Sequence, residues 1–387
     1  MALITLQPKQ VAELGNVALK NTLGENAVIL TEDLTNVVDS GVALENANAY
    51  KNFVENLMVA TAKYIFRFRK YSAKAPAILR DNYEYGQLIQ KIRGEMPDLS
   101  DNQTFMLEPN ASYDDNTYTP NEVEVTLFMK QITFEVRKSI TNKQIKNAFT
   151  SATQLGNFVS MQFGLVQNRL ELALEKLSYQ CINNYMGTLV KRNTGADAGK
   201  RVIPLLTMYK AEVPDADATL TADKALYHKG FLIYASAIIN DYVELFKQYL
   251  TEMNADEYAT FTPEDLLHVC LLSKFVDNMG SYAENSTFHN EFNKLPQGFK
   301  VNFWQGLGDR SIASRSKIDV KLDDGTSISQ SYIIGFIFDH DALGINHDQP
   351  SVETHYVKSS QFTNYWYKEE LGMFNDFSEN GVIFVIQ

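Results

Sequence analysis

One short stretch of the chain gathers imidazole and carboxylate side chains that could bind a metal ion. They are Asp339, His340, Asp341, His347, Asp348 and His355. Such ligands suit a hard or borderline divalent cation. However, Gly344 and Pro350 interrupt the stretch, so no single helix or strand would hold the ligands in one geometry. A polar surface loop is the better interpretation, and we expect no metal site here.

Two glycine-containing segments could be mistaken for nucleotide-binding loops. A phosphate-binding loop needs four residues between its glycines and a Ser or Thr after its Lys. Here three residues separate Gly195 from Gly199, and Arg201 follows Lys200. The second segment, residues 306–309, lacks the third glycine of a dinucleotide-binding turn. We expect a flexible surface loop and a turn, and no cofactor.

The chain also lacks the marks of nucleophilic catalysis. No Gly-x-Ser-x-Gly elbow is present, and neither Cys181 nor Cys270 has a basic neighbour in the sequence. Cys181 lies on the apolar face of a predicted helix, so we expect it to be buried and inert. Four acidic residues lack the spacing of an EF-hand loop: Asp98, Asp101, Asp114 and Asp115. The sequence therefore predicts a protein that is not an enzyme.

Length and composition limit the number of domains and the classes of protein to which this chain could belong. A chain of 387 residues exceeds the size at which one core stops growing, so we expect two packed domains with extensions. The net charge of −12 argues against a protein that reads nucleic acid, which needs a concentrated cationic face. The first residues do not look like a signal peptide, and no apolar stretch reaches the roughly 20 residues of a membrane helix. We expect a protein that is made in the cytosol and has no membrane partner.

The first half of the chain predicts an arm followed by a projection. Residues 1–45 are weakly periodic and suggest an arm without a core of its own. Residues 46–62 have helical spacing and residues 64–69 suggest a strand. Residues 75–121 form a proline-containing polar loop, and residues 122–136 form a strand whose apolar positions change parity, which indicates a bulge or a change of face. We expect a long two-stranded projection that rests on another chain, because such a hairpin is marginal alone.

The second half of the chain predicts a long helix and a mixed domain. Apolar residues recur every three or four positions over residues 153–186, which predicts a helix roughly 50 Å long. Leu170 and Leu174 belong to its apolar stripe. A polar loop at residues 192–201 is a plausible domain boundary. Beyond it we expect a helix at 231–253 and short strands at 266–272, 299–304, 332–338 and 381–385.

The order of these elements resembles the major capsid protein fold of tailed bacteriophages, most closely the short-tailed branch. Four stretches carry the likeness: residues 135–189, 262–267, 332–339 and 364–385. The resemblance implies an α+β fold with an N-terminal arm, an extended β-hairpin loop, a peripheral domain with a long spine helix, and a mixed α/β axial domain. The implied boundaries are 1–62 for the arm, 63–140 for the extended loop and its strands, 141–200 for the peripheral domain, 201–345 for the axial domain, and 346–387 for strands returning to the peripheral domain.

The resemblance also implies a function. The chain would assemble as pentamers and hexamers into the shell of a virion that encloses double-stranded DNA without sequence-specific binding. A separate scaffolding protein and a portal protein would be its partners, and assembly would take place in the host cytoplasm. Polar contacts between subunits are expected on the loop, at Arg80, Glu84, Lys91, Arg93, Glu95 and Asp98. Two alternatives remain at this stage, an encapsulin-type compartment shell and an unrelated α/β enzyme.

Overall fold

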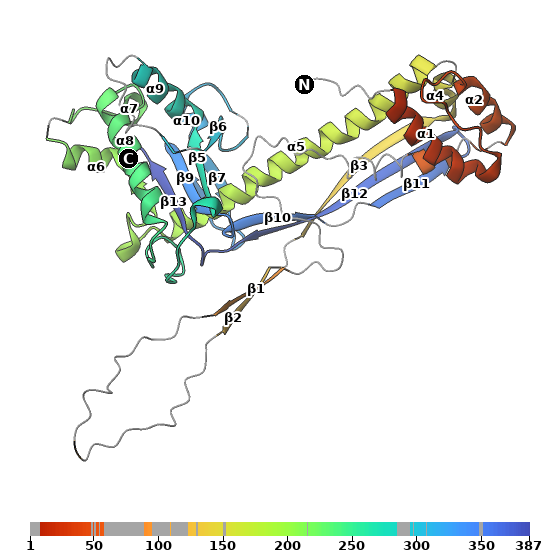
Figure 1. The fold of residues 1–387 in the computed structure, drawn as a ribbon. Helices are drawn as coiled ribbons and strands as arrows, with labels where there is room; N and C mark the ends of the chain where they lie inside the picture. Colours follow the sequence, from red (N-terminus) through yellow and green to blue (C-terminus); the bar gives the residue numbers. More distant parts are fainter. Residues whose placement is uncertain are drawn as a thin grey trace.

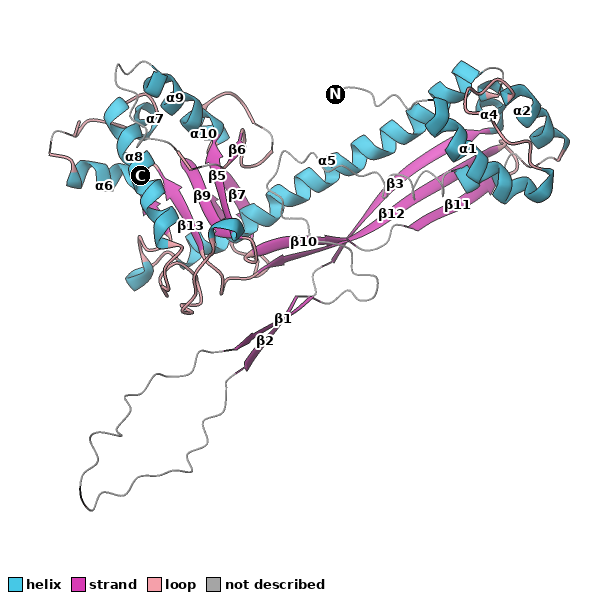
Figure 2. Ribbon diagram, viewed as in Figure 1, coloured by secondary structure: helices cyan, strands magenta, loops and turns pink. Residues whose placement is uncertain are grey.

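The structure is a computed structural model. It describes residues 8–47, 49, 52–53, 55–57, 89–94, 109, 123–128, 131–149, 152–214, 216–284, 295–296, 298–306, 308–347 and 351–387. One long helix, α5 (Ala152–Arg192), runs from a helical layer at one end of the molecule to a globular domain at the other (Figure 1). The fold mixes helices and sheets, as expected, and an elongated sheet lies along α5 (Figure 2).

Helix α5 holds two separate hydrophobic cores. It has 41 residues, which gives a length of about 60 Å at 1.5 Å per residue. Val166 and Leu170 belong to the core at the helical layer, whereas Leu174 and the buried residues after it belong to the core of the globular domain. The predicted stripe is confirmed, because Leu170 is 6% exposed, Leu174 1% and Cys181 0%.

The helical layer contains most of the described N-terminal residues. Its elements are α1 (Pro8–Leu23), η1 (Gly24–Asn26), α2 (Val37–Asn46) and α4 (Asn142–Ala148). Residues 52–53 and 55–57 are helical too, and Phe53 packs edge-on against Phe149 with the ring centres 5.3 Å apart. The layer buries Leu19, Leu44 and Phe53 in one cluster with Leu170 of α5 and Tyr365.

The expectation that residues 1–45 lack a core is therefore wrong. Their apolar residues pack against side chains that are more than a hundred positions away in the sequence. Phe149, for example, lies so close to Gly41 that a Cβ atom added at Gly41 would be only 2.7 Å from the Phe149 Cβ. Such distant contacts cannot be read from local periodicity. Ala49, Phe53 and Leu57 of the predicted helix at 46–62 are buried, and the predicted strand at 64–69 lies outside the described residues.

The elongated sheet is antiparallel and has four strands. These are β3 (Gln131–Thr141), β10 (Leu343–His347), β11 (Ser351–Val357) and β12 (Phe362–Asn375), with β12 paired to the other three. Buried and partly exposed positions alternate along β12, as expected for a strand with one face covered. The predicted strand at 122–136 is in fact two strands in two sheets, β2 (Val123–Phe128) and β3, so the change of parity marks a change of sheet and not a bulge.

The globular domain is built on a second sheet of five strands. In spatial order they are β4 (Val202–Pro204), β13 (Gly381–Val385), β9 (Ile333–Asp339), β5 (Leu267–Leu272) and β6 (Phe299–Val301). The predicted strands at 266–272, 332–338 and 381–385 are confirmed, and the strand predicted at 299–304 is present but ends at Val301. However, β13 lies in this sheet between β4 and β9. The expectation that all of residues 346–387 return to the peripheral domain is therefore wrong for the last strand.

Helices and a small hairpin surround this sheet. They are η3 (Gly195–Asp197), α6 (Leu205–Glu212), α7 (Ala222–Ala225), α8 (Lys229–Leu245), η4 (Glu264–Leu266), α9 (Ser273–Glu284), α10 (Ile312–Arg315), β7 (Ile318–Lys321) and β8 (Ser327–Gln330). The helix predicted at 231–253 ends earlier, at Leu245. No helix of the described chain is long and apolar enough to cross a membrane.

The loop before β4 is more ordered than the sequence suggested. Gly195 and Gly199 adopt left-handed backbone angles of +61° and +82°, which glycine tolerates best. Arg201 is 1% exposed, and its guanidinium donates a hydrogen bond of 2.7 Å to the carbonyl of Asn254. It also pairs with Asp197 at 3.2 Å. The glycines therefore shape a turn that Arg201 anchors, and the expected surface position is confirmed because Gly195 and Gly199 are exposed.

We expect Leu170→Asp to lower the free energy of unfolding by at least about 3 kcal/mol, because the change removes a packed side chain and buries an unpaired charge. Urea unfolding of the purified subunit and its soluble yield are the measurements. Leu172→Asp is the matched control, because Leu172 is 41% exposed on the same helix. Equal losses of stability in the two variants would show that the apolar stripe is misplaced.

Candidate assembly site at the base of the ribbon

Strands β1 (Ile89–Gly94) and β2 form a two-stranded antiparallel ribbon with two different faces. Lys91 pairs across the ribbon with Thr126, and Arg93 pairs with Glu124, so this face is polar. Ile92 pairs with Val125 on the opposite face. Alternation along each strand places Val123 and Leu127 on that same face.

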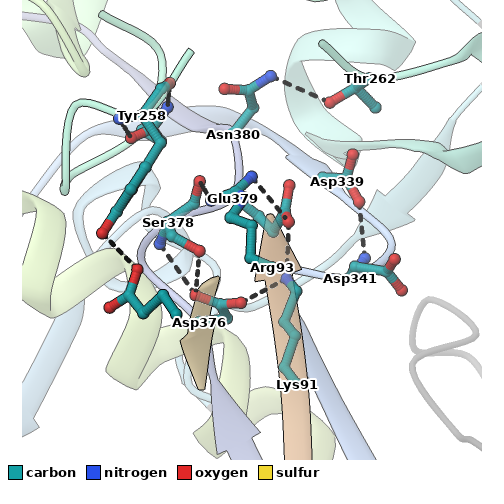
Figure 3. A network of polar contacts seen from close by, with 12 residues as sticks. Lys91, Arg93, Tyr258, Thr262, Asp339, Asp341, Asp376, Ser378, Glu379 and Asn380 are labelled. Carbon is teal, nitrogen blue, oxygen red and sulfur yellow. Dashed lines mark hydrogen bonds and ion pairs between the residues drawn. The ribbon is translucent and has the colours of Figure 1, made fainter. Parts of the chain in front are cut away.

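The polar face docks on the loop that joins β12 to β13 (Figure 3). The Lys91 ammonium binds the carboxylates of Asp376 and Glu379, with its Nζ 2.6 Å from Glu379 Oε1. The Asp376 and Glu379 side chains are only 5% and 10% exposed. A cation from the ribbon therefore neutralises two nearly buried carboxylates of the body.

Arg93 extends this contact toward the globular domain. Its guanidinium donates to the Ser378 carbonyl at 3.1 Å and lies 3.3 Å from Glu379 Oε1. It also lies over the Tyr258 ring, 5.0 Å from the ring centre. The Tyr258 hydroxyl donates in turn to Glu124 of β2, so both strands of the ribbon are attached.

The receiving loop is held by its own hydrogen bonds. Asp376 Oδ1 accepts from the backbone nitrogen of Ser378 at 3.0 Å and from its hydroxyl at 2.7 Å. The buried Tyr185 hydroxyl of α5 donates to the Glu379 carbonyl at 2.8 Å. Asn380 donates from its side chain to Thr262 Oγ1 at 3.2 Å. These bonds within the loop, to α5 and to Thr262 hold the carboxylates of the loop in a defined position.

Burial and pairing act in opposite directions on these charges. Burial tends to lower the pKa of the Lys91 ammonium, but Asp376 and Glu379 outweigh it and raise the pKa above its ordinary value. For Glu379, burial dominates and raises the pKa, although Lys91 and Arg93 oppose the rise. Burial also raises the pKa of Asp339, which lies nearby. The loop is therefore an unfavourable place for carboxylates unless the ribbon supplies its cations.

The outward face of the ribbon is apolar and exposed. Ile92 is 65% exposed, Val123 58%, Leu127 51% and Val125 49%. At the end of the ribbon next to β3, Phe128 packs on Phe374 of β12 with the ring centres 5.2 Å apart. A strand pair in water normally turns its polar face outward. This ribbon does the reverse, because its polar face is bound to its own chain.

Two of the six residues predicted for subunit contacts can be located. Lys91 and Arg93 contact acidic residues of their own chain, and their role between subunits stays a prediction. The other four, Arg80, Glu84, Glu95 and Asp98, lie outside the described residues. Tyr258, Asp376 and Glu379 were not predicted from the sequence. Lys91 and Asp376 are 285 positions apart, and no local signal connects them.

The stretch that could have bound a metal is used for other contacts. His340 Nδ1 lies 2.9 Å from Nε2 of His268, and Asp339 accepts from the backbone nitrogen of Asp341 at 2.7 Å. Burial and the neighbouring His340 lower the pKa of His268 to about 4. Within the part of the chain that is described, no group of three or more His, Cys, Asp or Glu residues is arranged to hold a metal ion.

A large exposed apolar face on a projecting ribbon is typical of a subunit that packs against other chains. Residues 16–385 match the model of the family of Phi29-like phage major capsid proteins, and the chain belongs to this family. It is therefore a structural subunit of a phage shell, part of the virion. This membership does not favour the alternative of an encapsulin-type compartment.

Solved structures of similar fold come from other phages. A chain of the Staphylococcus phage Andhra capsid has a TM-score of 0.47 at 8% identity, covering 81% of this chain and 84% of that chain. A chain of the cyanophage P-SCSP1u capsid has a TM-score of 0.43 at 13% identity, covering 80% and 86%. A search of curated proteins found no match. The assignment rests on the family match.

We expect Lys91→Met to lower the free energy of unfolding by about 1–3 kcal/mol, because two nearly buried carboxylates lose their cation. Urea unfolding and the rate of proteolysis within the ribbon are the measurements. Lys146→Met is the matched control, because Lys146 and its partner Glu45 are both at least half exposed, and it should cost less than about 1 kcal/mol.

The double variant Lys91→Met with Glu379→Gln should recover part of this loss, since only one carboxylate then remains without its lysine. If Lys91→Met is no more harmful than Lys146→Met, the ribbon is not held by this ion pair.

Proposed function

We propose that the exposed apolar face of the ribbon packs on a neighbouring copy of the chain, in pentamers and hexamers that close the shell. This proposal is based on the difference between the two faces of the ribbon, one polar and one apolar. Lys91 and Arg93 bind the polar face to the subunit itself, which leaves Ile92, Val123, Val125 and Leu127 free for a partner. A two-stranded ribbon alone is marginally stable in water, so covering this face stabilises the ribbon as well as the contact.

The segment that joins the two ribbon strands adds an electrostatic preference. Residues 95–122 contain seven Asp and Glu residues and no Lys or Arg. The partner surface should therefore combine apolar and cationic side chains. A groove of about 730 Å³ between β3 and α5 has largely this character. Three of its lining residues are apolar, three are cationic and one is acidic: Val136, Leu165, Val166, Arg137, Lys138, Arg169 and Glu135.

The groove contains a buried amine, that of Lys138, whose hydrogen-bonding capacity is not satisfied within the described part of the chain. Lys138 Nζ is buried and has no hydrogen-bond partner among the described residues, and burial lowers the pKa of this ammonium. Leu165, at the rim, is 50% exposed. A carboxylate from a second copy would satisfy the amine while the apolar face of the ribbon covers Leu165. We infer that this groove is where the ribbon of the neighbour lies.

Other features of the proposed function rest on the resemblance to tailed-phage capsid proteins. We infer that the chain belongs to the short-tailed branch, is assembled in the host cytoplasm around a portal protein, and encloses double-stranded DNA without reading its sequence. A net charge of −12 suits a wall that should not bind DNA tightly. No catalytic role is proposed, because neither Cys181 nor Cys270 is exposed and neither suits nucleophilic chemistry.

Boundaries for the implied domains are proposed in the same way. The arm is assigned to residues 1–62, the extended loop and its strands to 63–140, the peripheral domain to 141–200, and the axial domain to 201–345. Helices α1 and α2, the ribbon, α5, and strands β4, β5, β6 and β9 fall within these four ranges in order, which supports the assignment.

Val125→Lys should leave the stability of the free subunit within about 0.5 kcal/mol, because the side chain is exposed there, and should abolish assembly. Sedimentation and electron microscopy of the assembled fraction are the measurements. Val38→Lys is the matched control, because Val38 is equally exposed, at 50%, but lies on α2. If Val125→Lys assembles normally, the ribbon face is not a contact between subunits.

We also infer that a separate scaffolding protein sets the curvature of the shell. Pentamer and hexamer contacts differ by small angles, and the described N-terminal helices are packed on their own chain. The chain expressed alone should therefore form open sheets, tubes or shells of mixed size in electron micrographs. Uniform closed shells formed without a partner would refute this inference.

A further inference from the structure

The globular domain carries a second feature that the ribbon does not explain. A cavity of about 430 Å³ is lined by Tyr227, Lys274, Phe303, Arg310, Ile312 and Arg315. It lies between the end of α7, the start of α9, and α10. Three of these six residues are cations, two are aromatic and none is acidic. In a chain with 47 acidic and 35 basic residues, such a lining is unusual.

The aromatic rings hold two of the cations in place. Lys274 Nζ lies 5.3 Å from the centre of the Tyr227 ring, and the Arg315 guanidinium lies 5.5 Å from that of Phe303. Arg315 also donates to Ser273 Oγ at 2.8 Å, which fixes its direction. Among the described residues, neither Lys274 nor Arg310 forms an ion pair. The cavity therefore offers three cationic side chains, two of them held against aromatic rings, to an anionic group.

A matching group of carboxylates lies on the same domain. Residues 211–223 contain four Asp and Glu residues and no Lys or Arg. Among the described residues, three of them accept hydrogen bonds from hydroxyl or backbone groups and form no ion pair. Glu212 accepts from the Tyr234 hydroxyl at 2.6 Å, Asp217 from the Thr219 hydroxyl at 2.7 Å and backbone nitrogen at 2.9 Å, and Asp223 from the Tyr332 hydroxyl at 2.8 Å. Hydrogen bonds from Thr219 lower the pKa of Asp217, so it is ionised at neutral pH.

Glu212 and Asp217 lie before α7, whereas Arg310 and Arg315 line the cavity on its α10 side. Figure 1 places α6, from which the acidic loop continues, at the left edge of the globular domain, and α10 with β6 at its right. A surface and its complement at different positions on one chain give a head-to-tail contact. Repeated by rotation, such a contact closes into a ring of subunits.

We propose that the cavity between α7, α9 and α10 receives the acidic loop at residues 211–223 of a second copy, so that this contact links adjacent globular domains within a capsomer. The proposal rests on the function proposed above, because it assumes that copies of this chain surround one another. It concerns a different surface from the ribbon and can fail independently of it.

A charge exchange tests the pairing. One variant carries Lys274→Glu and Arg310→Glu, a second carries Glu212→Lys and Asp217→Lys, and a third combines all four changes. Each of the first two should lower the assembled fraction, measured by sedimentation, by at least about tenfold. The third should restore most of it, because the charges then match in reverse.

The proposal is overturned if either half-exchange assembles like the parent chain, or if the combined variant is no better than the halves. It is also overturned if the first variant assembles normally but encloses less nucleic acid, because the cavity then faces phosphates. A parent chain that never assembles contradicts the function proposed above, whereas a parent that assembles regardless of these charges contradicts only this contact.

A second experiment distinguishes loss of the contact from loss of folding in the charge variants. Asp217→Cys and Arg310→Cys together should form disulfides between copies under oxidising conditions, which appear as multimers on a non-reducing gel. The native Cys181 and Cys270 are both fully buried, so background pairing is low. Asp265→Cys with Arg310→Cys is the control pair. Equal multimer formation by the two pairs would overturn the proposal.

Discussion

One helix shared by two hydrophobic cores is the constraint on which the rest of this structure depends. Helix α5 buries Val166 and Leu170 in the helical layer and the stretch from Leu174 onward in the globular domain. A rigid helix of about 60 Å keeps the two cores at a constant separation. A shell subunit needs this property, since contacts at both ends of an elongated molecule must match its neighbours at the same time.

Ion pairs attach the ribbon to the part of the subunit that α5 holds together. Its cations Lys91 and Arg93 bind the loop at residues 376–380, where the chain leaves the elongated sheet and enters the sheet of the globular domain. The Tyr185 hydroxyl of α5 bonds to the same loop. The position of the ribbon is therefore set by the junction of the two sheets. Because Asp376 and Glu379 are nearly buried, leaving them without cations is costly, which favours the docked ribbon.

Local sequence patterns predicted the helices and strands in which buried side chains recur at regular intervals. The spacing of three and four along α5 and the apolar runs of β5, β9 and β13 were readable, because each of these elements buries one face or is fully enclosed. The two-stranded projection was predicted differently, from the long polar loop and the strand that follows it. The core of the N-terminal helices and the ion pairs of Lys91 depend on residues more than a hundred positions away. Nor could the change of parity near residue 129 reveal that the chain changes sheet. The cation-lined cavity was missed for the same reason, because Tyr227, Lys274 and Arg310 meet only in the folded chain.

Assembly should cover the apolar face of the ribbon, and the accessibility of Val125 in the shell tests this directly. A Val125→Cys variant can be labelled with a thiol reagent as free subunit and as assembled particle, since Cys181 and Cys270 are both fully buried. The account predicts rapid labelling of the free subunit and at least about tenfold slower labelling of the particle. Equal labelling rates in the two states would show that the face remains open in the shell and would contradict the account.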